Sequence, residues 1–176
     1  MKDDQLILEM NNISKSFSGV KALVDVSISC KKGSVHALVG ENGAGKSTLI
    51  KILSGAQRPD KGTICFKGKN YESFSTREAL SFGISVIYQE LALVSEMNVV
   101  ENIFLGREIR MTVGIIDSAR MRQEANKLLE QMGIKINVNR EVGELSVAYQ
   151  QMVEISKALS RNADLIVMDE PSAILA

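Results

Sequence analysis

One stretch organises this sequence: Gly40-Glu41-Asn42-Gly43-Ala44-Gly45-Lys46-Ser47. It matches the pattern G-x-x-x-x-G-K-[ST], in which glycines let main-chain N–H groups turn inward around an anion. The Lys46 ammonium can reach the β and γ phosphates of a nucleotide, and the Ser47 hydroxyl can ligate Mg²⁺. The stretch therefore predicts a phosphate-binding loop.

The residues on either side of this loop support the prediction. Val35–Val39 are apolar and predict a short buried strand that runs into the loop. Thr48–Ser54 predict a helix that leaves it and ends at Gly55, so Thr48 joins the predicted nucleotide-binding set. The N-terminus of such a helix carries a partial positive charge that favours a bound phosphate. This context distinguishes a phosphate loop from a chance glycine-rich turn.

Composition narrows the class of protein. The chain has 176 residues, of which 45% are hydrophobic, enough for one domain with a core. Its 21 basic residues balance its 21 acidic residues, which argues against a nucleic-acid partner bound through bulk charge but leaves room for a local basic patch. Cys30 and Cys65 lack metal-ligand spacing and are predicted to be free thiols in a reducing compartment. No apolar run approaches a membrane span, so any membrane role is expected to come through a partner.

Hydrophobic patterning predicts an α/β fold. Apolar and β-branched runs before and after the loop predict an antiparallel patch, and a strand, a mostly helical stretch and a last apolar strand follow. The predicted strands are Leu6–Met10, Ala22–Ile28, Thr63–Phe66, Ile84–Tyr88 and Asp164–Met168. The predicted helices are Thr76–Phe82, Val99–Leu105, Ser118–Met132 and a last one from Ser146 to Leu159.

The last predicted strand ends in Asp169 and Glu170. Downstream of a phosphate loop, this pair has a mechanical meaning. Asp169 can hold Mg²⁺ through its water shell, and Glu170 can accept a proton from a water that attacks the γ-phosphate. Alone, the two acids would be an ordinary solvated strand end; together with the phosphate loop, they predict the second half of a nucleotide-hydrolysing site.

With these motifs the sequence resembles the ATPase subunits of ATP-binding cassette (ABC) transporters over nearly its whole length. Gln89 resembles the family's Q-loop glutamine, which can sense Mg²⁺ or water, and Phe17 resembles the aromatic residue that stacks on adenine. The family signature Leu-Ser-Gly-Gly-Gln corresponds to Leu145-Ser146-Val147-Ala148-Tyr149. Because Ser146 is predicted to begin a helix, its hydroxyl and free amides suit an anion held by a second cassette.

Two stretches resemble the monosaccharide-importer branch, namely Tyr88–Val94 and Glu101–Glu108. This resemblance implies ATP and Mg²⁺ as ligands, membrane permease subunits as partners, and a second cassette in tandem or as a dimer. It also implies a periplasmic sugar-binding protein that acts indirectly, and a place in the cytoplasm, peripheral on the inner face of the cell membrane.

The sequence departs from the family pattern in two places. Tyr149 replaces the signature glutamine, while Val147 and Ala148 replace two glycines as they do in the sugar branch. The chain also stops at Ala176, before the family's switch histidine, and His36 precedes the phosphate loop and cannot take that role. Residues 1–176 are therefore expected to form an incomplete ABC ATPase domain, truncated at the C-terminus.

The predicted fold is a P-loop NTPase core with an antiparallel β subdomain and a helical insert at about 90–160. The predicted function is ATP binding and hydrolysis that energises monosaccharide import through a permease, with the chain as given expected to be inactive in hydrolysis. Two alternatives stay open. One is a nucleotide-binding fragment that does not hydrolyse ATP; the other is a soluble ABC protein that works on nucleic acid or ribosomes and takes no part in transport.

Overall fold

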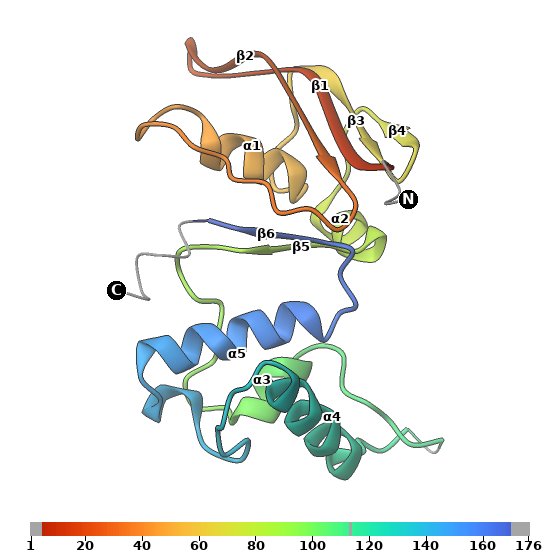
Figure 1. Ribbon diagram of the computed structural model, residues 1–176, viewed down its shortest axis with the longest axis vertical. Helices are drawn as coiled ribbons and strands as arrows, with labels where there is room; N and C mark the ends of the chain where they lie inside the picture. Colours follow the sequence, from red (N-terminus) through yellow and green to blue (C-terminus); the bar gives the residue numbers. More distant parts are fainter. Residues whose placement is uncertain (1–4, 113, 170–176) are drawn as a thin grey trace. The chain divides into compact units, whose positions relative to one another are not determined.

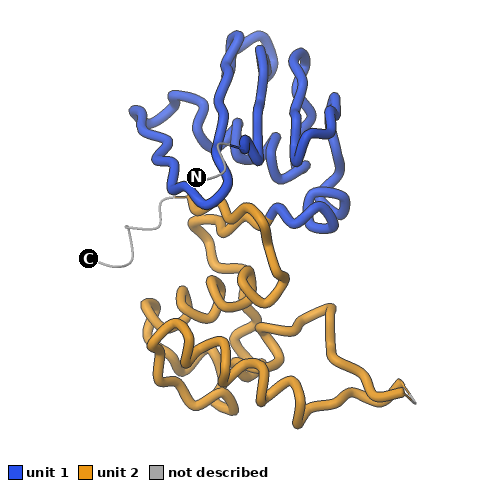
Figure 2. The backbone as a smooth tube through the Cα atoms, turned by 45° about the vertical axis from the view of Figure 1, so that its right-hand side comes forward, with its two compact units in different colours: residues 1–84 blue, residues 85–176 orange. Residues whose placement is uncertain are grey.

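The computed structural model describes residues 5–112 and 114–169. The chain divides into two compact units, residues 1–84 and residues 85–176 (Figure 2). In the described residues, the first unit contains a four-stranded sheet with two helices. The second contains three α-helices, a short 3₁₀ helix and a two-stranded sheet that begins at the boundary (Figure 1).

The sheet of the first unit is antiparallel, with strand order β2-β1-β3-β4. Its strands are β1 (Leu6–Phe17), β2 (Val20–Lys31), β3 (Lys61–Phe66) and β4 (Lys69–Tyr71). Met10 on β1 pairs with Ile64 on β3, and both side chains are fully buried. The antiparallel patch is thus confirmed, and β1 and β2 extend beyond the predicted apolar segments as one long hairpin.

Two helices complete the first unit. Helix α1 (Lys46–Leu53) leaves the glycine-rich loop and buries the side chains of Leu49, Ile50, Ile52 and Leu53. Helix α2 (Thr76–Phe82) begins with a capping box, in which Ser75 and Glu78 bind each other's backbone amides, and it ends at Gly83 with φ +92°. The apolar face of α1 therefore fixes the direction in which the glycine-rich loop meets the helix.

The prediction for Val35–Val39 is wrong, because this segment is not a strand. No described residue forms a ladder with it, and the side chains of Val35 and Val39 are 101% and 89% exposed. A buried strand needs neighbours that satisfy its backbone groups and cover its side chains. The sheet of the first unit ends at β2 and β4. The apolar pattern indicates a segment suited to burial, but it does not supply the neighbours that burial requires.

In the second unit, strand β5 (Ile84–Ile87) pairs with β6 (Leu165–Met168). Just past the end of β6, the Asp169 N–H donates to the Ile87 carbonyl at 2.9 Å. The carboxyl ends of the two strands therefore lie together, as in a parallel pair. This edge is the place where residues following β5 and residues following β6 meet.

The helices between these strands are α3 (Val99–Phe104), α4 (Ser118–Gln131), the 3₁₀ helix η1 (Val142–Glu144) and α5 (Val147–Leu159). Helix α4 begins as predicted, with the Asp117 carboxylate accepting from the Arg120 amide, and it is followed by Gly133 at φ +71°. The helices share one hydrophobic core, in which Ile103, Leu129 and Val153 are almost fully buried. A helical insert at about 90–160 remains a prediction.

None of the helices in the described part of the chain is long and apolar enough to cross a membrane.

Candidate functional site

The glycine-rich loop has the backbone that its sequence predicts. Gly43 and Gly45 adopt φ values of +85° and +90°, and Gly45 occupies the N-cap position of α1. A Cβ on Gly45 would lie 2.6 Å from the Ala22 carbonyl oxygen and 2.7 Å from a Leu23 methyl carbon. Gly45 is therefore required twice, by its conformation and by the close approach of the loop to β2.

The Lys46 side chain folds back over this loop. Its Nζ donates to the carbonyl of Gly40 at 2.7 Å and to that of Glu41 at 3.0 Å. The first bond of α1 runs from the Leu49 N–H to the Gly45 carbonyl, so the amides before Leu49 are not used within the helix. Free amides at a helix start, together with an ammonium, can bind an anion such as phosphate.

The other predicted loop residues are mostly exposed. Glu41, Asn42, Gly43 and Ala44 are exposed, and the Ala44 amide donates to the Glu41 carbonyl at 3.1 Å. In the first turn of α1, Ser47 is exposed and Thr48 is half-buried. The loop and the first turn of α1 thus offer an exposed hydroxyl at Ser47, backbone amides and the ammonium of Lys46.

Phe17 belongs to the same unit as the loop. It ends β1, pairs with Val20 across the hairpin turn, and is 41% exposed. The Lys15 ammonium lies 5.5 Å from the centroid of the Phe17 ring. Gly45 approaches Ala22 and Leu23 of β2 too closely to leave room for a Cβ. The hairpin that carries Phe17 therefore also packs against the glycine-rich loop.

The second unit brings two more predicted residues together. Gln89 lies two residues beyond β5 and is exposed, and Asp169 directly follows β6. The bond from the Asp169 N–H to the Ile87 carbonyl places them at one edge of the two-stranded sheet. Glu170 lies outside the described residues.

The signature segment forms the start of α5. Ser146 is the N-cap residue, but its side chain makes no capping bond, and residues 146–149 are exposed. Leu145, by contrast, is buried in the core of the second unit. Behind the segment, the Gln150 side-chain amide donates to the carbonyls of Val142 and Leu145 at 3.1 and 3.2 Å. The segment is thus held from behind, with the Ser146 hydroxyl and the Tyr149 ring outward.

The segment that follows Gln89 is hydrogen-bonded to helices α3 and α5. The Lys157 ammonium on α5 donates to the Ala92 carbonyl at 2.6 Å. Asn102, fully buried on α3, exchanges two hydrogen bonds with the backbone of Val94. The chain that follows Gln89 is therefore fixed to both α3 and α5.

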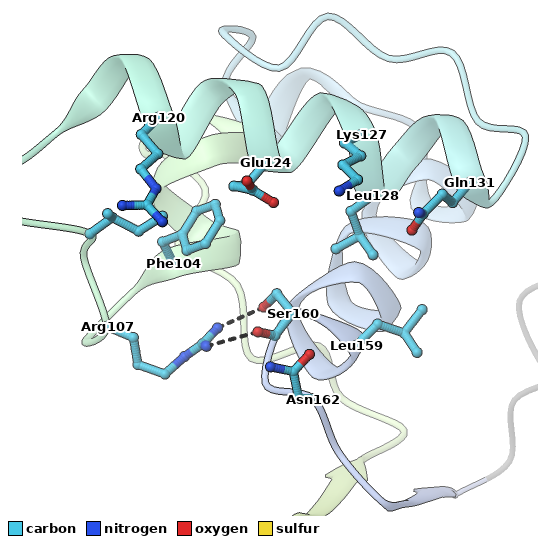
Figure 3. A pocket seen from close by; sticks show the side chains of 11 residues that line it. Phe104, Arg107, Arg120, Glu124, Lys127, Leu128, Gln131, Leu159, Ser160 and Asn162 are labelled. Carbon is cyan, nitrogen blue, oxygen red and sulfur yellow. Dashed lines mark hydrogen bonds between the residues drawn. The ribbon is translucent and has the colours of Figure 1, made fainter.

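A pocket of about 490 Å³ lies among the helices of the second unit (Figure 3). Arg107 donates to the Ser160 hydroxyl at 2.6 Å and to the Ser160 carbonyl at 3.2 Å. Burial and the nearby Arg161 lower the pKa of Arg107. Among the described residues, no carboxylate forms an ion pair with Arg107, Arg120 or Lys127. The pocket is lined by Phe104, Arg107, Ile109, Arg120, Glu124, Lys127, Leu128, Gln131, Leu159, Ser160 and Asn162.

The match to a protein family covers most of the chain. A family model described as "ABC transporter" matches residues 23–173. This chain belongs to the ABC transporter family. The resemblance drawn from the phosphate loop, the signature segment and the terminal acids is thereby confirmed.

Curated relatives of this ABC chain carry import names. It is 50% identical over 169 residues to the "Ribose import ATP-binding protein RbsA" of Caldanaerobacter subterraneus, covering 96% of this chain and 34% of that protein. It is 48% identical over 175 residues to the "Galactose/methyl galactoside import ATP-binding protein MglA" of Clostridium perfringens, covering 99% of this chain and 34% of that protein. The chain thus spans about a third of the length of these relatives.

Solved structures agree with the fold. An ATP-binding cassette of an ABC transporter in its ADP conformation has a TM-score of 0.85 at 35% identity, over 98% of this chain and 71% of that chain. A nucleotide-free cassette has a TM-score of 0.81 at 34% identity, over 96% and 70%. The predicted P-loop NTPase fold is confirmed, and it is the fold of a nucleotide-binding domain.

Sequence reasoning missed three features near these residues: the contacts of Asp60 with the strand before Phe17, the Gln150 amide behind the signature, and the cationic pocket. Each depends on residues brought together by folding, and no local pattern signals them.

Proposed function

We propose that this chain is the ATP-binding part of an importer that uses ATP hydrolysis to move a monosaccharide through a membrane permease. The observation that supports this most is its 50% identity, over 96% of its length, to a ribose import ATP-binding protein. On this proposal it works in the cytoplasm, held at the inner face of the membrane by the permease. A periplasmic sugar-binding protein would deliver the sugar to the permease and would not contact this chain.

In this function the loop residues 40–48 bind the phosphates of ATP. Lys46 exchanges its present bonds to the Gly40 and Glu41 carbonyls for bonds to phosphate oxygens, which are better partners for an ammonium because they are charged. Phe17 stacks on adenine through its exposed ring. The phosphate and the base would then be bound by one unit, from two segments joined by packing at Gly45.

Each of the two units offers one oxygen donor of the kind that Mg²⁺ prefers. Ser47 presents an exposed hydroxyl, and Asp169 a carboxylate at the edge where β5 and β6 end. No three His, Cys, Asp or Glu side chains among the described residues cluster as a metal cage. Mg²⁺ keeps several of its waters in proteins and is bound by few protein ligands together with phosphates. When bound, Mg²⁺ would neutralise phosphate charge.

The remaining roles concern hydrolysis. Glu170 accepts a proton from the attacking water, and Gln89, at the same sheet edge as Asp169, orients that water or contacts the metal shell. Ser146 and the exposed amides of residues 146–149 bind the nucleotide held by a second cassette. That cassette would be in tandem in the same protein or in a second copy.

The helical unit supplies the surface that we propose for the permease. The pocket in Figure 3 presents three cationic side chains without an ion-pair partner among the described residues, together with apolar side chains such as Phe104 and Leu128. Lys157 and Asn102 bind the backbone of Ala92 and Val94, in the segment that follows Gln89. A displacement of α3 and α5 would therefore also displace this segment and could move Gln89.

The test is Glu170→Gln in a protein that carries this chain and the rest of the cassette pair. The amide keeps the shape of the carboxylate but cannot accept the proton, so ATP should still bind and hydrolysis should be far slower. Phosphate release and uptake of labelled ribose, galactose and xylose are measured together. Turnover within about twofold of the parent would exclude Glu170 as the base. Recovery of RNA in place of a permease on purification from membranes would favour the soluble alternative.

A further inference from the structure

Asp60 binds three consecutive residues of β1, just before Phe17. Its Oδ1 accepts from the Lys15 ammonium at 2.8 Å, and its Oδ2 accepts from the Ser16 N–H at 2.7 Å. Its own N–H donates to the Ser14 carbonyl at 2.8 Å. The bonds from Lys15 and from the Ser16 N–H hold the pKa of the Asp60 carboxyl below its usual value. Asp60 directly precedes β3, so it binds β1 from the side opposite β2.

In this half of β1 the pairing with both neighbouring strands is irregular. The pairing of β1 with β2 shifts register at four places, three of them beyond Met10. The pairing with β3 also shifts between Asn11 and Ser14, and Asn12 has a left-handed backbone with φ +55°. Each irregularity interrupts the backbone ladder and bends the strand, and side chains take over part of the hydrogen bonding, as when the Asn12 N–H donates to the Ser27 hydroxyl at 2.9 Å. Side-chain bonds from Asp60 therefore replace regular ladder bonds where the strand approaches Phe17.

The same contacts orient the Phe17 ring. Lys15, held by Asp60, has a side chain only 14% exposed, and its ammonium lies 5.5 Å from the ring centroid. A cation at this distance is attracted to an aromatic ring. Phe17 itself is 41% exposed. One contact of the ring is thus made by a half-buried cation, and a substantial part of the ring stays open to solvent.

We propose that Asp60 is a positioning residue for the nucleobase: by holding Lys15 and the end of β1, it presents the Phe17 ring to adenine. This rests on the proposed function, in which Phe17 stacks on the base. Asp60 does not touch the nucleotide and acts through Lys15 and Phe17. Its effect should therefore concern the base and leave the phosphates unaffected.

The experiment compares two ligands by calorimetric titration of the purified chain: MgATP, and magnesium tripolyphosphate, which lacks the base. Asp60→Asn keeps the size of the side chain but replaces one acceptor oxygen with an amide that cannot accept from Lys15 or Ser16. We expect Asp60→Asn to weaken MgATP binding by at least about threefold and tripolyphosphate binding by less than about twofold. Glu72→Gln, an exposed carboxylate change in the same unit, is the matched control and should change neither.

Three further variants separate the proposal from its basis. Phe17→Ala should weaken MgATP alone, Lys15→Met should behave like Asp60→Asn, and the double variant of Asp60 and Phe17 should bind no worse than Phe17→Ala. If Phe17→Ala weakens MgATP while Asp60→Asn does not, the positioning role is overturned and adenine stacking stands. If Phe17→Ala changes nothing, both fail. Equal loss of both ligands in Asp60→Asn would show a general structural role and would also overturn the proposal.

Discussion

The phosphate loop and the signature segment both end at a helix N-terminus, but they are built in opposite ways. The phosphate loop closes on itself: Gly45 is pressed against β2, and Lys46 donates to carbonyls of its own loop. The signature segment faces outward, since Ser146 makes no side-chain capping bond and its support comes from Gln150 behind it. The phosphate loop should therefore be sensitive to changes that disturb its backbone packing. The signature segment should be sensitive to loss of the hydrogen bonds from Gln150 behind it.

The largest effect should follow from Gly45→Ala, because it attacks the closed site at its tightest contact. The new Cβ would lie 2.6 Å from the Ala22 carbonyl oxygen, and φ +90° disfavours a side chain independently of space. We expect MgATP binding to weaken by at least about a hundredfold, roughly 2.7 kcal/mol, measured by calorimetric titration.

Gly43→Ala is the matched control for that substitution. Gly43 has φ +85°, but a Cβ there would meet nothing within 4 Å. Gly43→Ala should therefore weaken MgATP binding only through backbone strain in the loop, by about 1–2 kcal/mol. Equal losses at both positions would mean that packing against β2 does not matter and would remove the contrast drawn above.

Lys46→Ala should have the next largest effect. The loop keeps its backbone, but it loses the ammonium that now donates to the Gly40 and Glu41 carbonyls and that we propose binds phosphate. MgATP affinity should fall at least tenfold, about 1.4 kcal/mol. Lys51→Ala, in the last turn of α1, removes an equal charge far from the loop and should leave the affinity unchanged. Unchanged binding in Lys46→Ala would contradict the assignment of the loop.

These two regions also show how far sequence reasoning reaches. The loop follows from local rules, since glycine conformation, helix start and motif spacing are all written in consecutive residues. The helix predicted at Ser118–Met132 followed in the same way and is observed as α4 (Ser118–Gln131). Contacts that join distant segments did not follow, such as Asp60 with Lys15, 45 residues apart. Val35–Val39 failed for the same reason, because a strand is defined by neighbours that its own residues do not encode.

For the signature segment, the sharpest test removes the Gln150 side chain that is hydrogen-bonded behind it. In Gln150→Ala, the Leu145 carbonyl loses the side-chain amide that donates to it at 3.2 Å. The free energy of unfolding should fall by about 1 kcal/mol, while MgATP binding at the phosphate loop should stay unchanged. Tyr149→Ala is the control, because Tyr149 is 46% exposed and its removal should cost little stability. Urea unfolding and calorimetric titration together would decide this, and loss of MgATP affinity in Gln150→Ala would show that the two regions are not independent.

The smallest effect should come from Glu154, on the helix that carries the signature. Glu154 is buried, and its Oε2 lies 3.8 Å from the Lys157 ammonium. Burial raises the pKa of its carboxyl above the ordinary 4.5, although Lys157 and Arg161 partly oppose this. The folded chain therefore binds this proton more tightly than the unfolded chain does. Stability from this group is greatest below the ordinary pKa and falls as pH rises through the raised folded value.

Glu154→Gln should remove the loss of stability that burial of the Glu154 charge causes as pH rises. The variant and the parent should differ least near about pH 4 and the variant should be the more stable near about pH 7, since glutamine carries no charge to bury. Urea unfolding across this range measures the difference, and Glu130→Gln, at an exposed position of α4, should show no such trend. A parent that gains stability relative to Glu154→Gln as pH rises would mean that the ion pair with Lys157 outweighs burial. In that case α5 would be held partly by charge, and the signature segment would depend on salt as well as on the Gln150 bonds.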